Sequence, residues 1–173
     1  MKLFDRLVAW LATLGLALAA IALLTSLALI VYSVAMRYFV NQPQAWIDEA
    51  VGYLLVASVM LAAAAALRDG EHICVDIITE KLSSKGQRLI AFAGTIAVAV
   101  AAALVLVEGY GTVEFSRMVG LRSNGYLALP LWVPQLLIPI GAALLGLAAI
   151  AALIEPRRPP APDLETKLTS GID

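Results

Sequence analysis

Charged residues are scarce in this sequence. Asp, Glu, Lys and Arg make up 14% of its 173 residues, whereas soluble domains carry about 25%. Hydrophobic residues make up 61%, which is more apolar surface than a water-soluble fold of this length could bury. The net charge of −1 excludes the strongly basic surface that is typical of nucleic-acid-binding proteins. The composition therefore indicates an integral membrane protein in contact with the lipid bilayer, with no nucleic-acid partner.

Cysteine and histidine each occur once, as Cys74 and His72. A single cysteine cannot form an internal disulfide. Haem in a membrane cytochrome needs axial ligands such as paired histidines within the spans, and one His with one Cys cannot complete a zinc site. The sequence also has no nucleophile elbow and no phosphate-binding glycine loop. We therefore expect no cofactor, no bound metal and no catalytic residues.

Four long runs lack any charged residue, and each is long enough to cross a bilayer, which takes about 20 residues. They are Leu7 to Met36, Ala50 to Leu67, Leu89 to Val107 and Ser123 to Ile154. The last run contains three prolines, so its helix should begin near Leu131. The sequence predicts an all-α membrane domain over residues 1–154, with spans at about 8–36, 47–68, 88–108 and 131–154. The first run is longer than the apolar part of a signal peptide, so we expect an uncleaved helix.

The distribution of Lys and Arg predicts the direction of the spans. Nine of these residues lie in the N-terminal segment, the middle connection and the C-terminal segment, and three lie in the other two connections. Positive residues gather on the cytoplasmic side of membrane proteins. Both termini and the middle connection are therefore expected in the cytoplasm.

The middle connection contains a pattern typical of a short amphipathic helix over residues 71–83. At 100° per residue its apolar side chains share one broad arc, with Asp76 on the polar side. Such a helix would lie flat on the membrane or against a partner, whereas the alternative is a solvated loop with some helical content. We expect His72 to make a polar contact there. Residues 155–173 are rich in proline and polar residues and are expected to be disordered.

A few charged residues lie next to the spans. Asp48 and Glu49 open the second span, where negative charge also complements the helix dipole. Glu108 is the most deeply placed charge and closes the third span. It could pair with Arg37, or it could sit at the interface without a partner.

Several short motifs, taken together, resemble the small membrane subunit (Q type) of tripartite ATP-independent periplasmic (TRAP) transporters. The resemblance covers roughly Asp5 to Ile154. The motifs are Arg37-Tyr38, Trp46-Ile47-Asp48-Glu49, Arg68-Asp69-Gly70-Glu71-His72-Ile73-Cys74-Val75-Asp76, Pro130-Leu131-Trp132 and Pro139-Ile140-Gly141. Members often have Glu-Glu after the tryptophan, and Asp48-Glu49 preserves that charge.

The resemblance implies a scaffold that partners a large multi-helix permease subunit in sodium-coupled transport, with the organic acid substrate delivered by a periplasmic binding protein. Two other functions would leave different signs in the sequence. A self-contained small exporter would carry a charge inside a span, usually the first, and an oxidoreductase anchor would carry paired histidines in its spans. We expect the partner interface to include Arg37, Trp46, Asp48, Glu49, His72, Asp76, Glu108 and Trp132.

Overall fold

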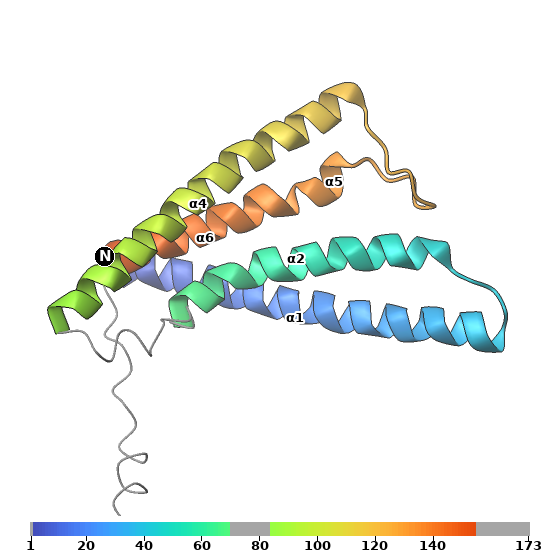
Figure 1. Ribbon diagram of the computed structural model, residues 1–173, viewed down its shortest axis with the longest axis horizontal. Coiled ribbons are helices and arrows are strands. Elements are labelled where there is room, and N and C mark those ends of the chain that lie inside the picture. The colour runs from blue at the N-terminus through green and yellow to red at the C-terminus, as the bar shows by residue number, and fades with distance from the viewer. Residues whose placement is uncertain (1, 70–83, 155–173) are drawn as a thin grey trace, which may run out of the picture.

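The computed structural model describes residues 2–69 and 84–154, and within these ranges the chain is helical with no strand (Figure 1). The helices are α1 (Lys2–Phe39), α2 (Ala45–Asp69), α4 (Ser84–Val119), the short α5 (Trp132–Gln135) and α6 (Leu137–Ile154). Four segments are long and apolar enough to cross a membrane, the last formed by α5 and α6 together. The prediction of an all-α, four-span membrane protein is confirmed. The predicted interfacial helix at 71–83 and the tail at 155–173 lie outside the described residues.

Two helices are longer than their apolar runs. α1 has 38 residues and α4 has 36, and α4 continues past Val107 to Val119. The end of a charge-free run therefore does not mark the end of a helix, and the span on α4 runs from Leu89 to Val119. α4 ends at Val119, and the next residue, Gly120, has a φ of 67°. The amide of Leu121 donates to the carbonyl of Ser116 (3.0 Å) and that of Gly120 to Arg117 (3.3 Å), which is a Schellman ending.

Proline explains the break between α5 and α6. An unbroken helix would require the amide of residue 139 to donate to the carbonyl of Gln135, and Pro139 has no amide hydrogen. α5 ends at Gln135, and α6 begins after Leu136. The sequence predicts the start of this span near Leu131, and Leu131 is the N-cap of α5.

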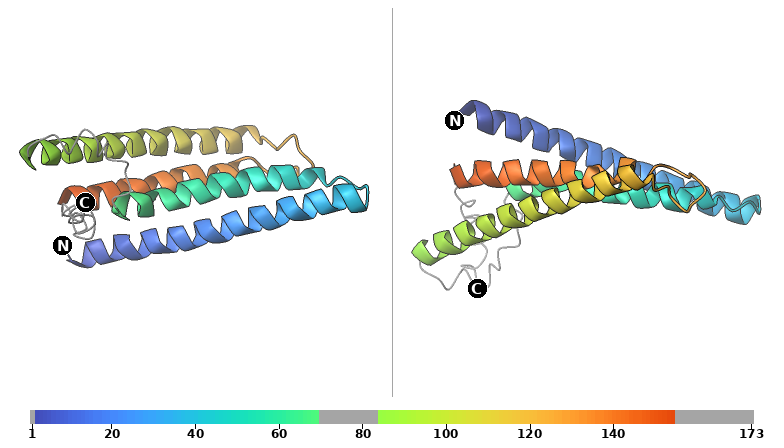
Figure 2. Two further views of the ribbon diagram at one scale, coloured as in Figure 1. Left: turned by 60° about the horizontal axis from the view of Figure 1, so that its bottom comes forward. Right: turned by 90° about the horizontal axis from the view of Figure 1, so that it is seen from above.

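The helices pack in the order α1, α2, α6, α4. α2 packs against α1 and α6, while α4 packs mainly against α6 and α5. α1 and α4 therefore lie at opposite edges, and they run at a wide angle to each other when seen from above (Figure 2). In the most apolar window of each span, 33% of α2 and of the α5–α6 segment is buried, but only 6% of α4. Most of α4 in this window is thus left uncovered by the rest of the described chain.

Small residues let the helices approach closely. The main buried cluster joins Val8 and Leu67 to a set of alanines, which are Ala12, Ala64, Ala65, Ala148, Ala149 and Ala151. A Cβ atom added to Gly15 would lie 2.7 Å from the carbonyl oxygen of Leu61. Lipid chains are as apolar as leucine, so helix association in a bilayer depends on such close packing.

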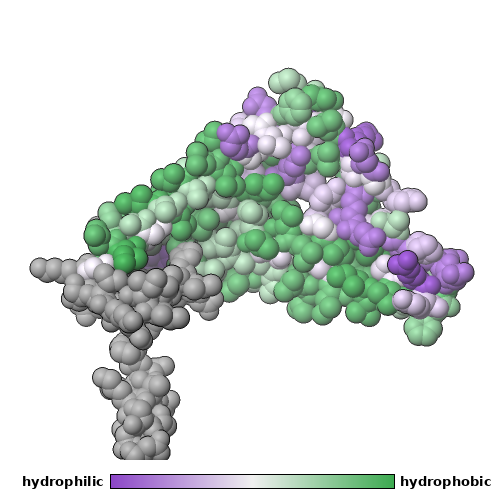
Figure 3. All heavy atoms as spheres, in the orientation of Figure 1, coloured by the Kyte–Doolittle hydropathy of each residue, from purple (hydrophilic) through white to green (hydrophobic). Residues whose placement is uncertain are grey.

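The two ends of the helices differ. We call the end with the connections 40–44 and 120–131 the loop end, and the end with Lys2, Asp69, Ser84 and Ile154 the terminal end (Figure 1). On the face drawn in Figure 3, hydrophobic side chains cover the sides of the helices, and hydrophilic ones gather at the loop end. This distribution suits a protein whose middle lies in lipid and whose ends lie in water.

Candidate functional site

Glu49, near the start of α2, is bonded to the connection between α4 and α5. Its Oε1 atom accepts a hydrogen bond from the Tyr53 hydroxyl (2.8 Å) and another from the Ser123 hydroxyl. Its Oε2 atom accepts a hydrogen bond from the backbone amide of Leu127 (3.2 Å). Both carboxylate oxygens are therefore occupied by groups of the same chain, two of which lie more than 70 residues away in sequence.

The connection that Glu49 binds has a defined shape. Arg122 and Pro130 form an antiparallel bridge. The amide of Ser123 donates to the carbonyl of Leu129 (2.9 Å), and the amide of Leu131 donates to that of Leu121 (3.0 Å). We call residues 121–131 the loop-end hairpin. It returns the chain from α4 to α5 and passes beside the start of α2.

Gly125 lies at the closest approach between the hairpin and α2. Its amide donates to the Ser123 hydroxyl (3.0 Å), which in turn donates to Glu49. A Cβ atom at Gly125 would overlap the Glu49 carboxylate, with Cδ of Glu49 only 2.7 Å away. Any side chain at position 125 would therefore force the Glu49 carboxylate to move from its present position.

The other residues expected at this end are not drawn into the Glu49 contacts. The indole nitrogen of Trp46 donates to Oε1 of Gln44 (3.1 Å). Asp48 and Arg37 are exposed, and Trp132 is half-buried at the start of α5. Within residues 2–69 and 84–154, neither Asp48 nor Arg37 has a side-chain hydrogen bond or ion pair. His72 and Asp76 lie outside the described residues.

Glu108 lies within α4, eleven residues before its end, and its side chain is exposed. The suggested pairing of Glu108 with Arg37 does not occur in the structure. In the described part of the chain the carboxylate of Glu108 has no hydrogen-bond or ion-pair partner. Whether Glu108 and the other seven residues contact another protein stays a prediction.

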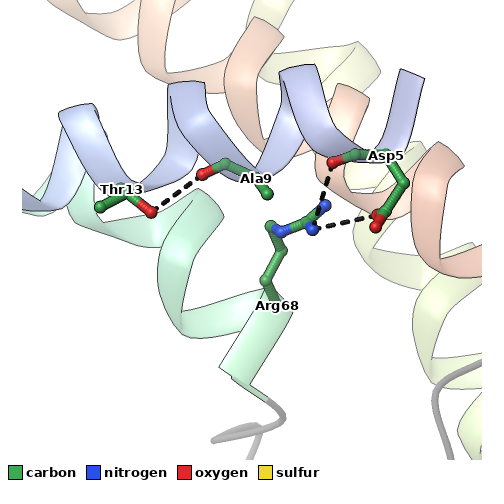
Figure 4. A network of polar contacts seen from close by, with 4 residues as sticks. All are labelled: Asp5, Ala9, Thr13 and Arg68. Carbon is green, nitrogen blue, oxygen red and sulfur yellow. Dashed lines mark hydrogen bonds and ion pairs between the residues drawn. The ribbon is translucent and has the colours of Figure 1, made fainter. Parts of the chain in front are cut away.

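An ion pair that we did not predict joins α1 to α2 at the terminal end (Figure 4). Nη2 of Arg68 lies 3.0 Å from Oδ1 of Asp5, and it also donates to the Asp5 carbonyl oxygen (3.4 Å). The Arg68 side chain is 7% exposed and that of Asp5 is 35% exposed. The pair closes the α1–α2 hairpin next to the alanine cluster.

Sequence reasoning thus missed Tyr53, Ser123, Gly125, Asp5 and Arg68 as contact residues. One local signal was available, because Ser123-Asn124-Gly125 is a typical turn sequence. Nothing local could show that this turn meets Glu49. No group of three or more His, Cys, Asp or Glu side chains in the described ranges could hold a metal ion.

Comparison with known proteins supplies the family. No curated protein matches this chain. Residues 26–158 match the family described as tripartite ATP-independent periplasmic transporters, DctQ component. That range starts inside α1 and includes the Glu49 contacts, the loop-end hairpin and all of α6. The chain therefore belongs to the DctQ family, the small membrane component of TRAP transporters.

Proposed function

We propose that the chain is the stationary scaffold beside the large permease subunit of a TRAP transporter. The complex takes up an organic acid that a periplasmic binding protein delivers, and sodium drives the uptake. The observation that carries this proposal is the exposure of α4, which is only 6% buried in its most apolar window and so presents a long apolar side to a membrane partner. Membership of a tripartite family supports the same assembly.

The polar contacts of the described chain also favour a support role. Transporter substrate sites are typically formed by broken helices with polar groups near the middle of the membrane. The described polar contacts between helices gather at the loop end around Glu49 and at the terminal end around Arg68. The serine and threonine hydroxyls bonded within α1 and α2 donate to carbonyls of their own helix, for example Ser26 to Ala22 (2.8 Å). Such contacts hold the helices in one arrangement, as expected of a stationary scaffold.

We further propose that the chain lies in the bacterial inner membrane with its terminal end in the cytoplasm. The loop end, with Glu49 and the hairpin, then faces the periplasm. This orientation rests on the distribution of Lys and Arg along the sequence.

The test is to purify the tagged chain from its native membrane, identify what copurifies, and measure uptake in vesicles. The scaffold proposal expects a large multi-helix subunit to copurify, and uptake of an organic acid only when both subunits are present. The chain alone should neither bind nor transport the acid. Saturable binding or uptake by the isolated chain would contradict the proposal and favour a self-contained transporter.

A further inference from the structure

The packing of the helices places Glu108 deeper in the membrane than the sequence suggests. By sequence, Glu108 ends the third apolar run. In the structure, the next residue, Gly109, packs against α6, because its Cβ would lie 3.2 Å from Cγ2 of Ile138 and 3.3 Å from Cδ of Pro139. Glu108 therefore lies level with the first turn of α6.

The contact between α6 and α2 shows which part of α2 lies at the same depth as Glu108. A Cβ atom on Gly141, half a turn further along α6, would lie 2.6 Å from the Cβ atom of Met60. At 1.5 Å per residue, Met60 is about 12 Å from Arg68 and about 16 Å from Glu49 along α2. Glu108 thus lies within about one helical turn of the midpoint between the charged ends of α2. The apolar middle of α2 is the part that must cross lipid, so Glu108 is at membrane depth.

Glu108 also faces outward at this depth. Its side chain is exposed, and in the part of the chain that the structure describes it has no polar partner. The side chain is too short to reach either end of α2. An ionisable side chain within a membrane is expensive unless another group pairs with it, and such residues mark functional contacts.

The helix face that bears Glu108 is suited to close helix packing. At 100° per residue, Gly94, Ala97 and Ala101 lie on the same side of α4 as Glu108, and all four are exposed. A Cβ atom on Gly94 would meet nothing within 4 Å. Small residues at an interface allow a second helix to approach the backbone.

We propose that this face, defined by Gly94, Ala97, Ala101 and Glu108, docks a transmembrane helix of the large subunit that carries an Arg or Lys at the depth of Glu108. Charge complementarity selects this occupant over lipid, because acyl chains offer no donor to a carboxylate. The inference rests on the proposed function and assigns it a particular surface and contact.

The first test places a photo-crosslinking amino acid at Ala101 and, separately, at Ala103 in the complete complex. Both positions are exposed, and they point to opposite flanks of α4. The proposal expects adducts with the large subunit from position 101 at several times the yield from position 103. Adducts with lipid or with a second copy of this chain at position 101, or equal yields from the two positions, would overturn it.

The second test measures how much large subunit copurifies with Glu108→Leu, using Glu114→Leu as the matched control. Glu114 is another exposed carboxylate on α4, on a different side and nearer the loop end. Glu108→Leu would leave a buried partner cation unpaired, so recovery should fall by about tenfold or more while the control stays at the wild-type level. The isolated Glu108→Leu chain should be at least as stable as wild type.

Unchanged recovery with Glu108→Leu would overturn the docking contact but leave the scaffold function standing. If no large subunit copurifies with the wild-type chain, the proposed function fails, and the docking contact fails with it.

Discussion

Gly141 of α6 lies against Met60 of α2 so closely that a Cβ atom on the glycine would be 2.6 Å from both Cβ and the carbonyl oxygen of Met60. One residue further along α2, the carbonyl oxygen of Leu61 meets Gly15 of α1 in the same way, at 2.7 Å. α2 is therefore held between two helices at a single level. The positions of α1 and α6 relative to α2 depend on these two glycines.

Substitution at Gly141 tests this packing. Gly141→Ala should destabilise the protein by about 1–3 kcal/mol, because α6 must move away from the backbone of α2. Gly52→Ala is the matched control, since a Cβ atom on Gly52 would meet nothing within 4 Å. Unfolding by heat or denaturant in detergent measures the difference. Equal effects of the two substitutions would show that the close contact does not limit the packing.

Loss of the Glu49 carboxylate should release the loop-end hairpin. In Glu49→Ala, the hydroxyls of Tyr53 and Ser123 and the amide of Leu127 lose their acceptor. Trypsin should then cleave after the exposed Arg122 several times faster than in wild type, with Glu49→Gln between the two because its amide keeps one acceptor oxygen. The control variant Asp48→Ala should be cleaved by trypsin at the wild-type rate. A slow, wild-type rate in Glu49→Ala would mean that other contacts hold the hairpin.

The Asp5–Arg68 pair should couple α1 to α2. We expect Asp5→Ala and Arg68→Ala each to lower the free energy of unfolding by about 1–3 kcal/mol, the range for hydrogen bonds to charged groups. The double substitution should cost less than the sum, by about 0.5–3 kcal/mol, because the two residues share a contact. Arg37→Ala, an exposed residue on α1, should change stability by no more than about 0.5 kcal/mol. Strict additivity of the first two substitutions would rule out the coupling.

The proposed orientation can be tested with a reporter that is active only in the cytoplasm. A fusion after Lys85 or after Glu165 should be active, and a fusion after Gln42 or Gly125 should be inactive. The reason is the excess of Lys and Arg in the segments at the terminal end. The reverse pattern of activities would show that the protein has the opposite orientation in the membrane.

The number of spans follows from the sequence because a bilayer imposes a simple requirement. A run of about 20 apolar residues must form a helix in lipid, so the four charge-free runs alone determine four spans. The proline-rich start of the last run likewise predicts where its helix begins, and Leu131 caps α5. The counts of cysteine and histidine also carry information by themselves, since Cys74 and His72 are too few to supply the ligands of a haem or zinc site within this chain.

What the sequence could not determine is how the helices are placed against one another. Alanines and glycines recur throughout the spans, so many registers would allow close packing, and only the tertiary structure selects Gly15 against Leu61 and Gly141 against Met60. That register brings Glu49 to Ser123 and Asp5 to Arg68, residues too far apart in sequence for any local pattern to pair. It also places Glu108, at the apparent end of a charge-free run, level with the first turn of α6. Composition determines which segments enter the membrane, whereas side-chain contacts between helices determine the depth and neighbours of each charged group.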